Sequence, residues 1–316
     1  MRMPVRRDGR CRRLHAPPRS VLAMSLRTRL LQGVLVAVSQ RSASKPFDPV
    51  KDRERGKKLE GRFKPKAGVT ETDVTLGGVP CKRFTSGGSA RGTFFHVHGG
   101  GYTGGSAAVG RLYTHIAAGG GPDVVSVDYR LAPEHPYPAA VDDALAAYRA
   151  VLETVPADKL VVGGESAGGN LTLALVQRLI AEGLPLPVAV VPVYPWSDLT
   201  HTSASWTTNG RRDILTKQGL DHCSLAYAGG LPLDDPRVSP QFGSFAGFPP
   251  ALIHVGSRDC LLEDARAVAR ALQAEGVPVT LREVDGAIHG FTVLPTAESK
   301  SAMSEIRDFV LEHLPA

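Results

Sequence analysis

The sequence predicts an α/β protein with a mostly parallel central sheet flanked by helices, and with a helical cap. Short apolar runs of strand length alternate along the chain with longer segments whose apolar residues recur at helical spacing. One such run, residues 160–162, enters a dense glycine turn, and an apolar helical pattern over residues 171–180 leaves it. Both observations are typical of helices packed on a buried sheet.

The expected strands are apolar runs bounded by turn residues. They cover residues 74–76, 81–84, 92–97, 124–127, 160–162, 188–193, 251–255 and 277–284. Helix-length patterns lie between most of them, at residues 107–118, 139–154, 171–181 and 262–274. This alternation predicts βαβ units and parallel pairing, whereas the opening pair of strands around a Gly-Gly turn predicts an antiparallel edge.

The remaining segments suggest how the chain is divided. Residues 1–23 are rich in arginine and lack apolar periodicity, so we expect an unstructured extension there. Residues 24–65 predict one or two cap helices with a break at 46–49, and residues 66–316 predict the main α/β domain. Inside that domain, residues 196–248 are polar and rich in glycine and proline, with one good helix expected near 216–228. We expect this insertion to lie over the carboxyl ends of the strands, where ligands bind in open α/β folds.

The first cap helix is expected to be amphipathic. Leu26, Leu30, Val34 and Val38 recur at i, i+4 spacing, which places them on one helical face. We expect this face to pack on the protein.

Three interpretations of residues 1–23 compete. Translation could begin at Met24, so that the segment is not part of the mature chain. The arginine-rich, acid-poor composition also fits a transit peptide, and the apolar run at 30–38 after basic residues fits a signal peptide. That run is far too short to span a membrane, so we expect no stable membrane insertion.

Charge and cysteine content narrow the class of protein and its compartment. Residues 1–45 contain ten arginines, one lysine and a single acid, so the formal net charge of +6 comes from this end of the chain. The body carries no basic and aromatic cluster, and we therefore expect no nucleic-acid partner. The four cysteines, Cys11, Cys81, Cys223 and Cys260, are widely spaced and fit core positions in a reducing, cytoplasmic compartment.

The glycine turn after residue 162 carries a G-x-S-x-G pattern at Gly164-Glu165-Ser166-Ala167-Gly168. This pattern is the nucleophile elbow, in which a sharp strand-to-helix turn lifts a serine hydroxyl above the sheet. Side chains at Gly164 and Gly168 would clash with the neighbouring strand and helix. The helix N-terminus behind the serine offers free N–H groups to a developing oxyanion.

A second glycine run, His98-Gly99-Gly100-Gly101, directly follows the strand at 92–97. In lipases and esterases such an HGGG loop supplies half of the oxyanion hole, beside the N–H of the residue after the nucleophile, here Ala167. The competing interpretation is a dinucleotide-binding fingerprint formed by Gly99, Gly101 and Gly104, with Asp128 at the end of the next strand. That interpretation leaves the serine elbow unexplained.

The general base and the acid should follow the serine in the order Ser, Asp/Glu, His. Among ten histidines, His289 lies in a glycine-flanked loop after the last strand, which is the place for a general base. His254 falls inside a strand and fits a packed histidine, His115 precedes the serine, and His313 falls in the terminal helix.

Asp259 comes four residues after the strand at 251–255 and is the expected acid. Glu263 and Asp264 fall in the first turn of the next helix, where acids commonly serve as caps. Asp285 fits a turn residue.

These motifs together resemble the bacterial hormone-sensitive-lipase-like esterases, family IV of the α/β-hydrolases. Residues 128–140 read DYRLAPEHPYPAA and match the family's DYRLAPEHPFPA almost letter for letter, and residues 194–199 resemble its YPW-x-D-L stretch. The similarity runs from about residue 74 to the end. Two positions depart from the pattern. Glu165 stands where many members have Asp, and the acid lies in Asp259-Cys260-Leu261, where Asp-Pro-Leu is usual.

The resemblance implies an α/β-hydrolase fold with Ser166, Asp259 and His289 as the triad. It also implies that Gly100, Gly101 and Ala167 donate to the oxyanion, and that the cap comes from the N-terminal helices and the insertion. The implied reaction is hydrolysis of small-molecule carboxylic esters through an acyl-enzyme, which requires no metal or organic cofactor.

Two alternatives stay open at this stage. A lactonase would use the same triad on cyclic esters. A non-catalytic receptor on this fold would resemble the plant hormone receptors of the family, which lack the catalytic histidine, whereas His289 is present here. The acyl and alcohol preferences and the oligomeric state, including a homodimer, are not determined by the sequence.

Overall fold

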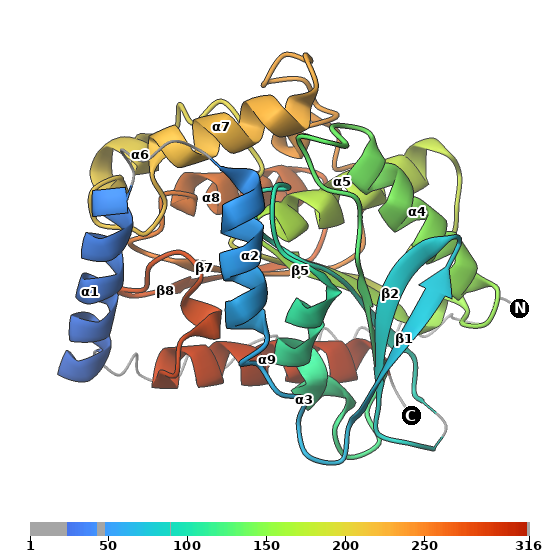
Figure 1. The fold of residues 1–316 in the computed structure, drawn as a ribbon. Helices are drawn as coiled ribbons and strands as arrows, with labels where there is room; N and C mark the ends of the chain where they lie inside the picture. The colour runs from blue at the N-terminus through green and yellow to red at the C-terminus, as the bar shows by residue number, and fades with distance from the viewer. Residues whose placement is uncertain (1–23, 43–47, 89, 315–316) are drawn as a thin grey trace, which may run out of the picture.

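A computed structural model describes residues 24–42, 48–88 and 90–314 (Figure 1). An eight-stranded sheet runs through the molecule in the order β1-β2-β4-β3-β5-β6-β7-β8. The strands are β1 (Thr70–Leu76), β2 (Val79–Thr85), β3 (Thr93–Val97), β4 (Asp123–Val127), β5 (Leu160–Glu165), β6 (Ala189–Val193), β7 (Ala251–Gly256) and β8 (Val279–Val284). The first two strand pairs, β1 with β2 and β2 with β4, are antiparallel, and all the others are parallel, which confirms the predicted fold class and edge.

The four central strands explain the continuous apolar runs of the sequence. Every residue of β3, β4, β5 and β6 is buried. A strand with a helix on each face has no solvent side, so its side chains do not need to alternate between apolar and polar.

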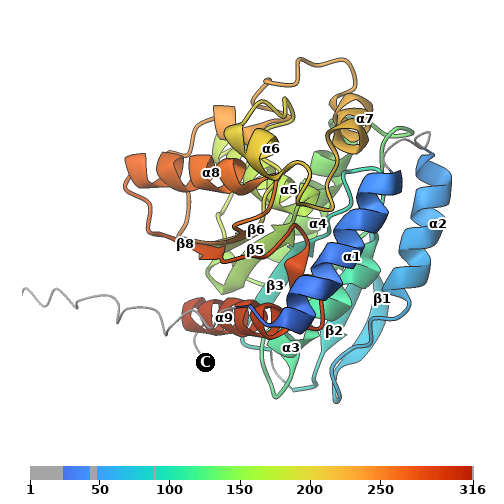
Figure 2. The ribbon, with the colours of Figure 1, turned by 90° about the vertical axis from the view of Figure 1, so that its left-hand side faces the viewer.

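Helices cover both faces of the sheet, with α4, α5 and α8 on one face and α3 and α9 on the other (Figure 2). The α-helices are α1 (Leu26–Ser42), α2 (Pro49–Glu60), α3 (Thr114–Ala117), α4 (Ala139–Leu152), α5 (Ala167–Ala181), α6 (Ala204–Asn209), α7 (Lys217–Ala228), α8 (Leu262–Ala274) and α9 (Ala297–His313). Short 3-10 turns cover Ala107–Tyr113, Ala157–Lys159, Pro240–Phe242 and Phe291–Val293.

The helix expected over residues 107–118 is not a single α-helix. The chain forms a 3-10 turn over Ala107–Tyr113 and then the four-residue helix α3. Gly110 lies in this turn, and a Cβ there would come within 2.6 Å of the Ser126 Cβ on β4. The backbone therefore packs directly on the sheet at a residue that disfavours an α-helix.

The insertion contains more structure than expected. Helix α7 confirms the helix predicted near residues 216–228, but a second helix, α6, precedes it. Six residues are too few for a helical period to be recognised in a sequence. Figure 1 shows α6 and α7 together at one side of the sheet, with α1 and α2 beside them.

The prediction for the apolar face of α1 is wrong. Leu26, Leu30, Val34 and Val38 are 72%, 63%, 62% and 58% exposed. The buried positions of the helix are instead Thr28, Gln32 and Val36, and Met24 just before it is also buried.

Polar contacts explain the orientation of α1. The Gln40 side-chain amide donates to the Gly210 and Asp213 carbonyl oxygens at 2.9 and 3.0 Å, and the Ser39 hydroxyl donates to the Ile214 carbonyl. These bonds attach the end of α1 to the turn between α6 and α7. Helical periodicity alone cannot report them, because they depend on a partner segment about 170 residues away.

The structure describes part of the N-terminal segment, from residue 24 onward, apart from residues 43–47. Helix α2 begins at Pro49, and the Asp48 carboxylate accepts from the Lys51 N–H, so a helix start lies at the predicted break. The expectation for residues 1–23, together with Cys11, lies outside the described residues. Within the described ranges, no helix has both the length and the apolar character needed to cross a bilayer.

The orientation of α1 gives a first test. Replacing Leu30 with Ala should change the free energy of unfolding by less than about 0.5 kcal/mol, because its side chain already faces water. Val36→Ala should cost about 1–2 kcal/mol, because the removed methyl groups are buried. Urea unfolding of both variants measures the difference, and the opposite order would mean that α1 packs through its apolar stripe.

Candidate active site

The elbow is formed where β5 ends and α5 begins. Ser166 separates the two elements and has φ 59° and ψ −118°, a backbone conformation that a non-glycine residue adopts only under constraint. A Cβ at Gly164 or Gly168 would lie 2.2 or 2.1 Å from the Val97 carbonyl oxygen. Both glycines are therefore required by the close approach of β3.

Ser166, His289 and Asp259 form one chain of hydrogen bonds. His289 Nε2 lies 2.9 Å from the Ser166 Oγ, and His289 Nδ1 lies 2.9 Å from Asp259 Oδ2. The second carboxylate oxygen of Asp259 accepts the Leu261 N–H at 2.8 Å. Asp259 is fully buried, whereas the serine remains partly accessible. This arrangement places a base beside a hydroxyl and a carboxylate behind the base, as nucleophilic catalysis requires.

The electrostatics of His289 suit a general base. Burial lowers the pKa of the imidazole, but the adjacent Asp259 carboxylate, aided by Asp213, raises the pKa above its ordinary value. The carboxylates therefore stabilise the imidazolium that would form when the serine proton is removed.

The HGGG loop, His98 to Gly101, lies beside the elbow and is called the glycine loop below. Gly100 and Gly101 have φ of 117° and 63°, conformations that favour glycine. Gly99 is adjacent to the serine turn, since a Cβ there would lie 2.6 Å from the Glu165 carbonyl oxygen. The structure thus brings the three glycines and Ala167 to the same side of the sheet as Ser166.

His98, the first residue of the HGGG loop, supports the loop and is fully buried. Its ring stacks on Tyr129 with centroids 4.1 Å apart, and its Nδ1 lies 2.8 Å from the Gly99 carbonyl oxygen. The Tyr129 hydroxyl donates to the His98 carbonyl at 2.7 Å. Part of the DYRLAPEHPYPAA segment therefore packs against this loop.

Glu165 connects the elbow to the glycine loop. One of its carboxylate oxygens accepts the Gly99 N–H at 2.8 Å, and the other contacts His96 Nε2 at 2.9 Å and the Tyr113 hydroxyl at 3.1 Å. Burial acts to raise the pKa of Glu165, but His96 and the Gly99 N–H outweigh it and lower the pKa. The carboxylate is thus stable as an anion inside the protein.

Asn170 is a further connecting residue that the sequence analysis did not identify. Its side-chain oxygen accepts the Tyr102 hydroxyl at 2.8 Å, and its amide donates to the Trp196 and Val238 carbonyls at 2.7 and 2.9 Å. Asn170 therefore joins the glycine loop to both ends of the insertion. Its place in the elbow stretch, Ser-Ala-Gly-Gly-Asn, was the only signal for it.

The other acids considered for the triad are bonded to groups other than His289. Asp264 is in the first turn of α8, as expected, but it is not a cap. It is 1% exposed, and its Oδ2 accepts the Ser197 and Asp198 N–H groups at 3.1 and 3.0 Å. Glu263 pairs with Arg266, and Asp285 contacts the Ser257 hydroxyl. Of these acids, only Asp259 forms a hydrogen bond with His289.

Two of the other candidate histidines, His254 and His115, have structural contacts. His254 is buried in β7, and burial lowers its pKa to about 4, which confirms the expected packed histidine. His115 bonds to the Leu112 and Met303 carbonyls and thereby joins α3 to α9.

Comparison with known proteins identifies the family of the chain. A family model described as the alpha/beta hydrolase fold matches residues 94–293. A crystal structure of a hormone-sensitive lipase from a metagenome library superposes with a TM-score of 0.84 at 34% identity, over 90% of this chain and 98% of that one. The chain is an α/β-hydrolase of the hormone-sensitive lipase family.

Curated relatives of this hydrolase carry the names of ester-cleaving enzymes. An esterase of Acinetobacter venetianus is 34% identical over 75% of this chain and 80% of its own length. An acetyl-hydrolase of Streptomyces hygroscopicus is 41% identical over 60% of this chain, and that match spans 65% of the relative.

The family assignment excludes the dinucleotide interpretation of the glycine run. Asp128, which that interpretation assigned to a ribose, accepts the Ala107 N–H at 2.9 Å instead. The acid therefore holds the start of the 3-10 turn after the glycine loop.

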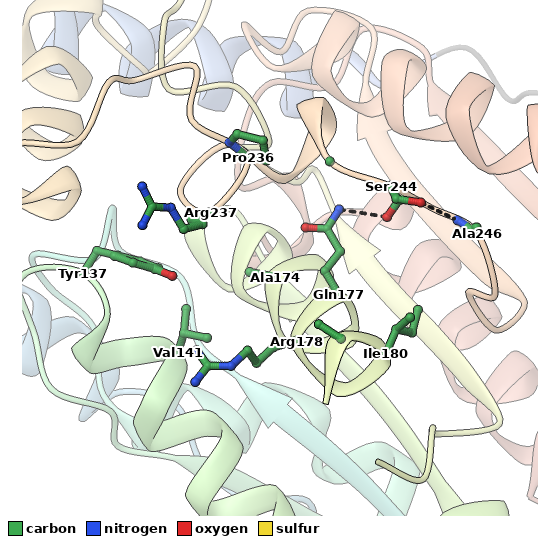
Figure 3. A pocket seen from close by; sticks show the side chains of 12 residues that line it. Tyr137, Val141, Ala174, Gln177, Arg178, Ile180, Pro236, Arg237, Ser244 and Ala246 are labelled. Atoms are coloured by element: carbon green, nitrogen blue, oxygen red, sulfur yellow. Dashed lines mark hydrogen bonds between the residues drawn. The ribbon is translucent and has the colours of Figure 1, made fainter. Parts of the chain in front are cut away.

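A separate cavity of about 350 Å³ lies between α4, the second half of α5 and residues 236–246 (Figure 3). Arg178 and Arg237 line it, and each already pairs with a carboxylate, Glu182 and Asp235 respectively. No triad residue lines this cavity. We therefore do not assign the ester site to it.

The elbow geometry gives a second test. Gly168→Ala should destabilise the hydrolase by about 3 kcal/mol or more, because the added methyl group meets the Val97 carbonyl and neither backbone can move away. Gly33→Ala is the matched control, since no atom lies within 4 Å of that Cβ position on α1. The control should be neutral or stabilising by up to about 1 kcal/mol. Equal melting temperatures for the two variants would contradict the close approach.

Proposed function

We propose that the protein hydrolyses short-chain carboxylic esters through an acyl-enzyme on Ser166. The observation that carries this proposal is the continuous hydrogen-bonded chain from the Ser166 hydroxyl through His289 to Asp259. The names of the relatives support an ester as the substrate.

In the proposed reaction, His289 takes the Ser166 proton as the serine oxygen bonds to the ester carbonyl carbon. The N–H groups of Gly100, Gly101 and Ala167 would bind the resulting oxyanion. His289 then protonates the leaving alcohol, and water activated by the same base releases the acid. Asp259 holds the imidazole in the required tautomer.

The alternatives are less well supported. A receptor that has lost catalysis needs neither a base beside the serine nor a carboxylate behind it, and both are present. A lactonase would use the same residues, but one relative, of Pseudomonas putida, is named an ethyl acetate hydrolase, and ethyl acetate is an acyclic ester.

Location and assembly remain predictions. We propose the cytoplasm, because Cys81, Cys223 and Cys260 are free thiols and disulfides form in oxidising compartments. Cell fractionation tests the location, and light scattering tests whether two copies pair.

Ser166→Ala should lower kcat on a p-nitrophenyl acetate substrate by about 10^4-fold or more while the protein stays folded. The reason is that no acyl-enzyme can form without the hydroxyl. A variant that kept more than a few per cent of the wild-type turnover would refute the nucleophile.

Asp259→Asn should lower kcat by about 10^4-fold, because the amide holds His289 in the wrong tautomer. Asp264→Asn is the matched control. Its remaining oxygen can still accept from Ser197 and Asp198, so activity should stay within about threefold. If the control were the inactive variant, the triad acid would be misassigned.

The pH profile provides an independent check. Activity requires neutral His289, and Asp259 raises the pKa of this imidazole, so kcat/KM should increase as the pH rises through a midpoint above about 6.5. Measurement between pH 5 and 9 tests this, and a midpoint well below 6 would contradict a carboxylate-supported base.

A further inference from the structure

We propose that Asp213 is a positioning residue for the triad, because it holds the loop of the acid and the loop of the base together. It belongs to the insertion within the catalytic domain, on the turn between α6 and α7, whereas the three triad residues lie outside that insertion. This inference rests on the proposed function, since it concerns the geometry of Ser166, His289 and Asp259.

The Asp213 carboxylate bridges two segments that are far apart in the sequence. Its Oδ1 accepts the backbone N–H of His289 at 2.9 Å, and its Oδ2 accepts the backbone N–H of Cys260 at 2.8 Å. Cys260 directly follows Asp259. One fully buried side chain therefore connects the backbone of the base to the residue beside the acid.

Neighbouring side chains of the insertion also form hydrogen bonds with the acid loop, the residues 257–261 that carry Asp259. On α6, the Asn209 amide donates to the Asp259 carbonyl at 2.9 Å, and the Ser205 hydroxyl donates to the Cys260 carbonyl. Both polar groups of the Cys260 backbone are thus bonded to the insertion. These side chains act together with a backbone bond between the two loops, from the Arg258 N–H to the Ala287 carbonyl at 2.9 Å. The insertion therefore fixes the part of the acid loop that follows this bond.

The turn that carries Asp213 is itself fixed from outside. Gln40 of α1 donates to the Gly210 and Asp213 carbonyls, and the Asp213 Oδ1 also accepts the Ile214 N–H at 2.7 Å. A continuous set of hydrogen bonds therefore runs from the N-terminal helix through Asp213 to His289. This connection is consistent with the orientation of α1, whose apolar stripe faces solvent.

Asp213 also acts on the charge of the site. Asp259, His289, the Cys260 thiol and the Arg258 guanidinium face it. Burial, followed by the Asp259 charge, raises the pKa of Asp213 to about 6. Above this pH its negative charge stabilises the His289 imidazolium, and below it the carboxyl group loses acceptor capacity for one of the two N–H groups.

Asp213→Asn tests the proposal because it keeps the shape and removes one acceptor and the charge. In either amide orientation, the NH2 group faces the N–H of His289 or of Cys260. We expect kcat to fall about 10- to 100-fold with KM within about threefold, as small misplacements of catalytic groups produce. The acid limb of the pH profile should move to lower pH, because a charge that stabilises the imidazolium has been removed. A purely structural role would not shift this midpoint.

Asp221→Asn is the matched control on α7 of the same insertion. Asp221 accepts from His201 and Lys217, and it contacts neither triad loop in the described chain. This variant should keep the wild-type kcat and pH midpoint. If Asp213→Asn matched the wild type in both quantities, the proposal would be wrong.

A second variant tests the same connection from α1. If Asp213→Asn does not fold, Gln40→Ala loosens the same turn from α1, and its kcat should fall several-fold at an unchanged KM. An unchanged kcat there would overturn the proposal.

The rate at which diethyl p-nitrophenyl phosphate labels Ser166 tests the positioning role without a carboxylic ester substrate. Ser166 bonds to phosphorus, p-nitrophenolate leaves, and His289 takes the serine proton. Slower labelling of Asp213→Asn supports the positioning role even if short-chain esters prove to be poor substrates. Equal labelling rates overturn it, and a wild-type protein that is neither labelled nor hydrolytic refutes both proposals.

Discussion

The close approach of β3 to the elbow is the constraint on which the site depends. β3 and β5 are neighbouring parallel strands, with Val97 paired to Gly164. The Val97 carbonyl occupies the space that side chains at Gly164 and Gly168 would need. Two neighbouring parallel strands end at the same edge, so the serine turn after β5 and the glycine loop after β3 are forced together.

Buried polar residues hold these two turns at a defined distance. Glu165 accepts from the glycine loop, and His96 and Tyr113 bind the rest of its carboxylate. Asn170 performs a similar task between Tyr102 and the insertion. Each of these groups would be costly to bury without partners, so satisfying them selects one arrangement of the loops.

The acid and base loops depend on the insertion in a different way. His289 and Asp259 follow β8 and β7, but the backbone beside them is bonded to side chains of α6 and of the following turn. One of the N–H groups that Asp213 accepts belongs to Cys260, at the position where the resembling esterases usually have proline. Proline has no N–H, so this bond depends on the departure from the family pattern.

The sequence alone determined the strands, their mostly parallel pairing and the residues that meet around Ser166, because apolar runs, glycine turns and strand ends are local signals. It did not determine the face by which α1 docks, the existence of α6, or the roles of Asp264 and Asp213. Leu26, Leu30, Val34 and Val38 formed the clearest apolar stripe, yet the hydrogen bonds of Ser39 and Gln40 place that stripe in solvent. Such contacts join segments distant in the chain, so only the tertiary structure decides them: a buried polar group gains its partner from wherever the fold brings one.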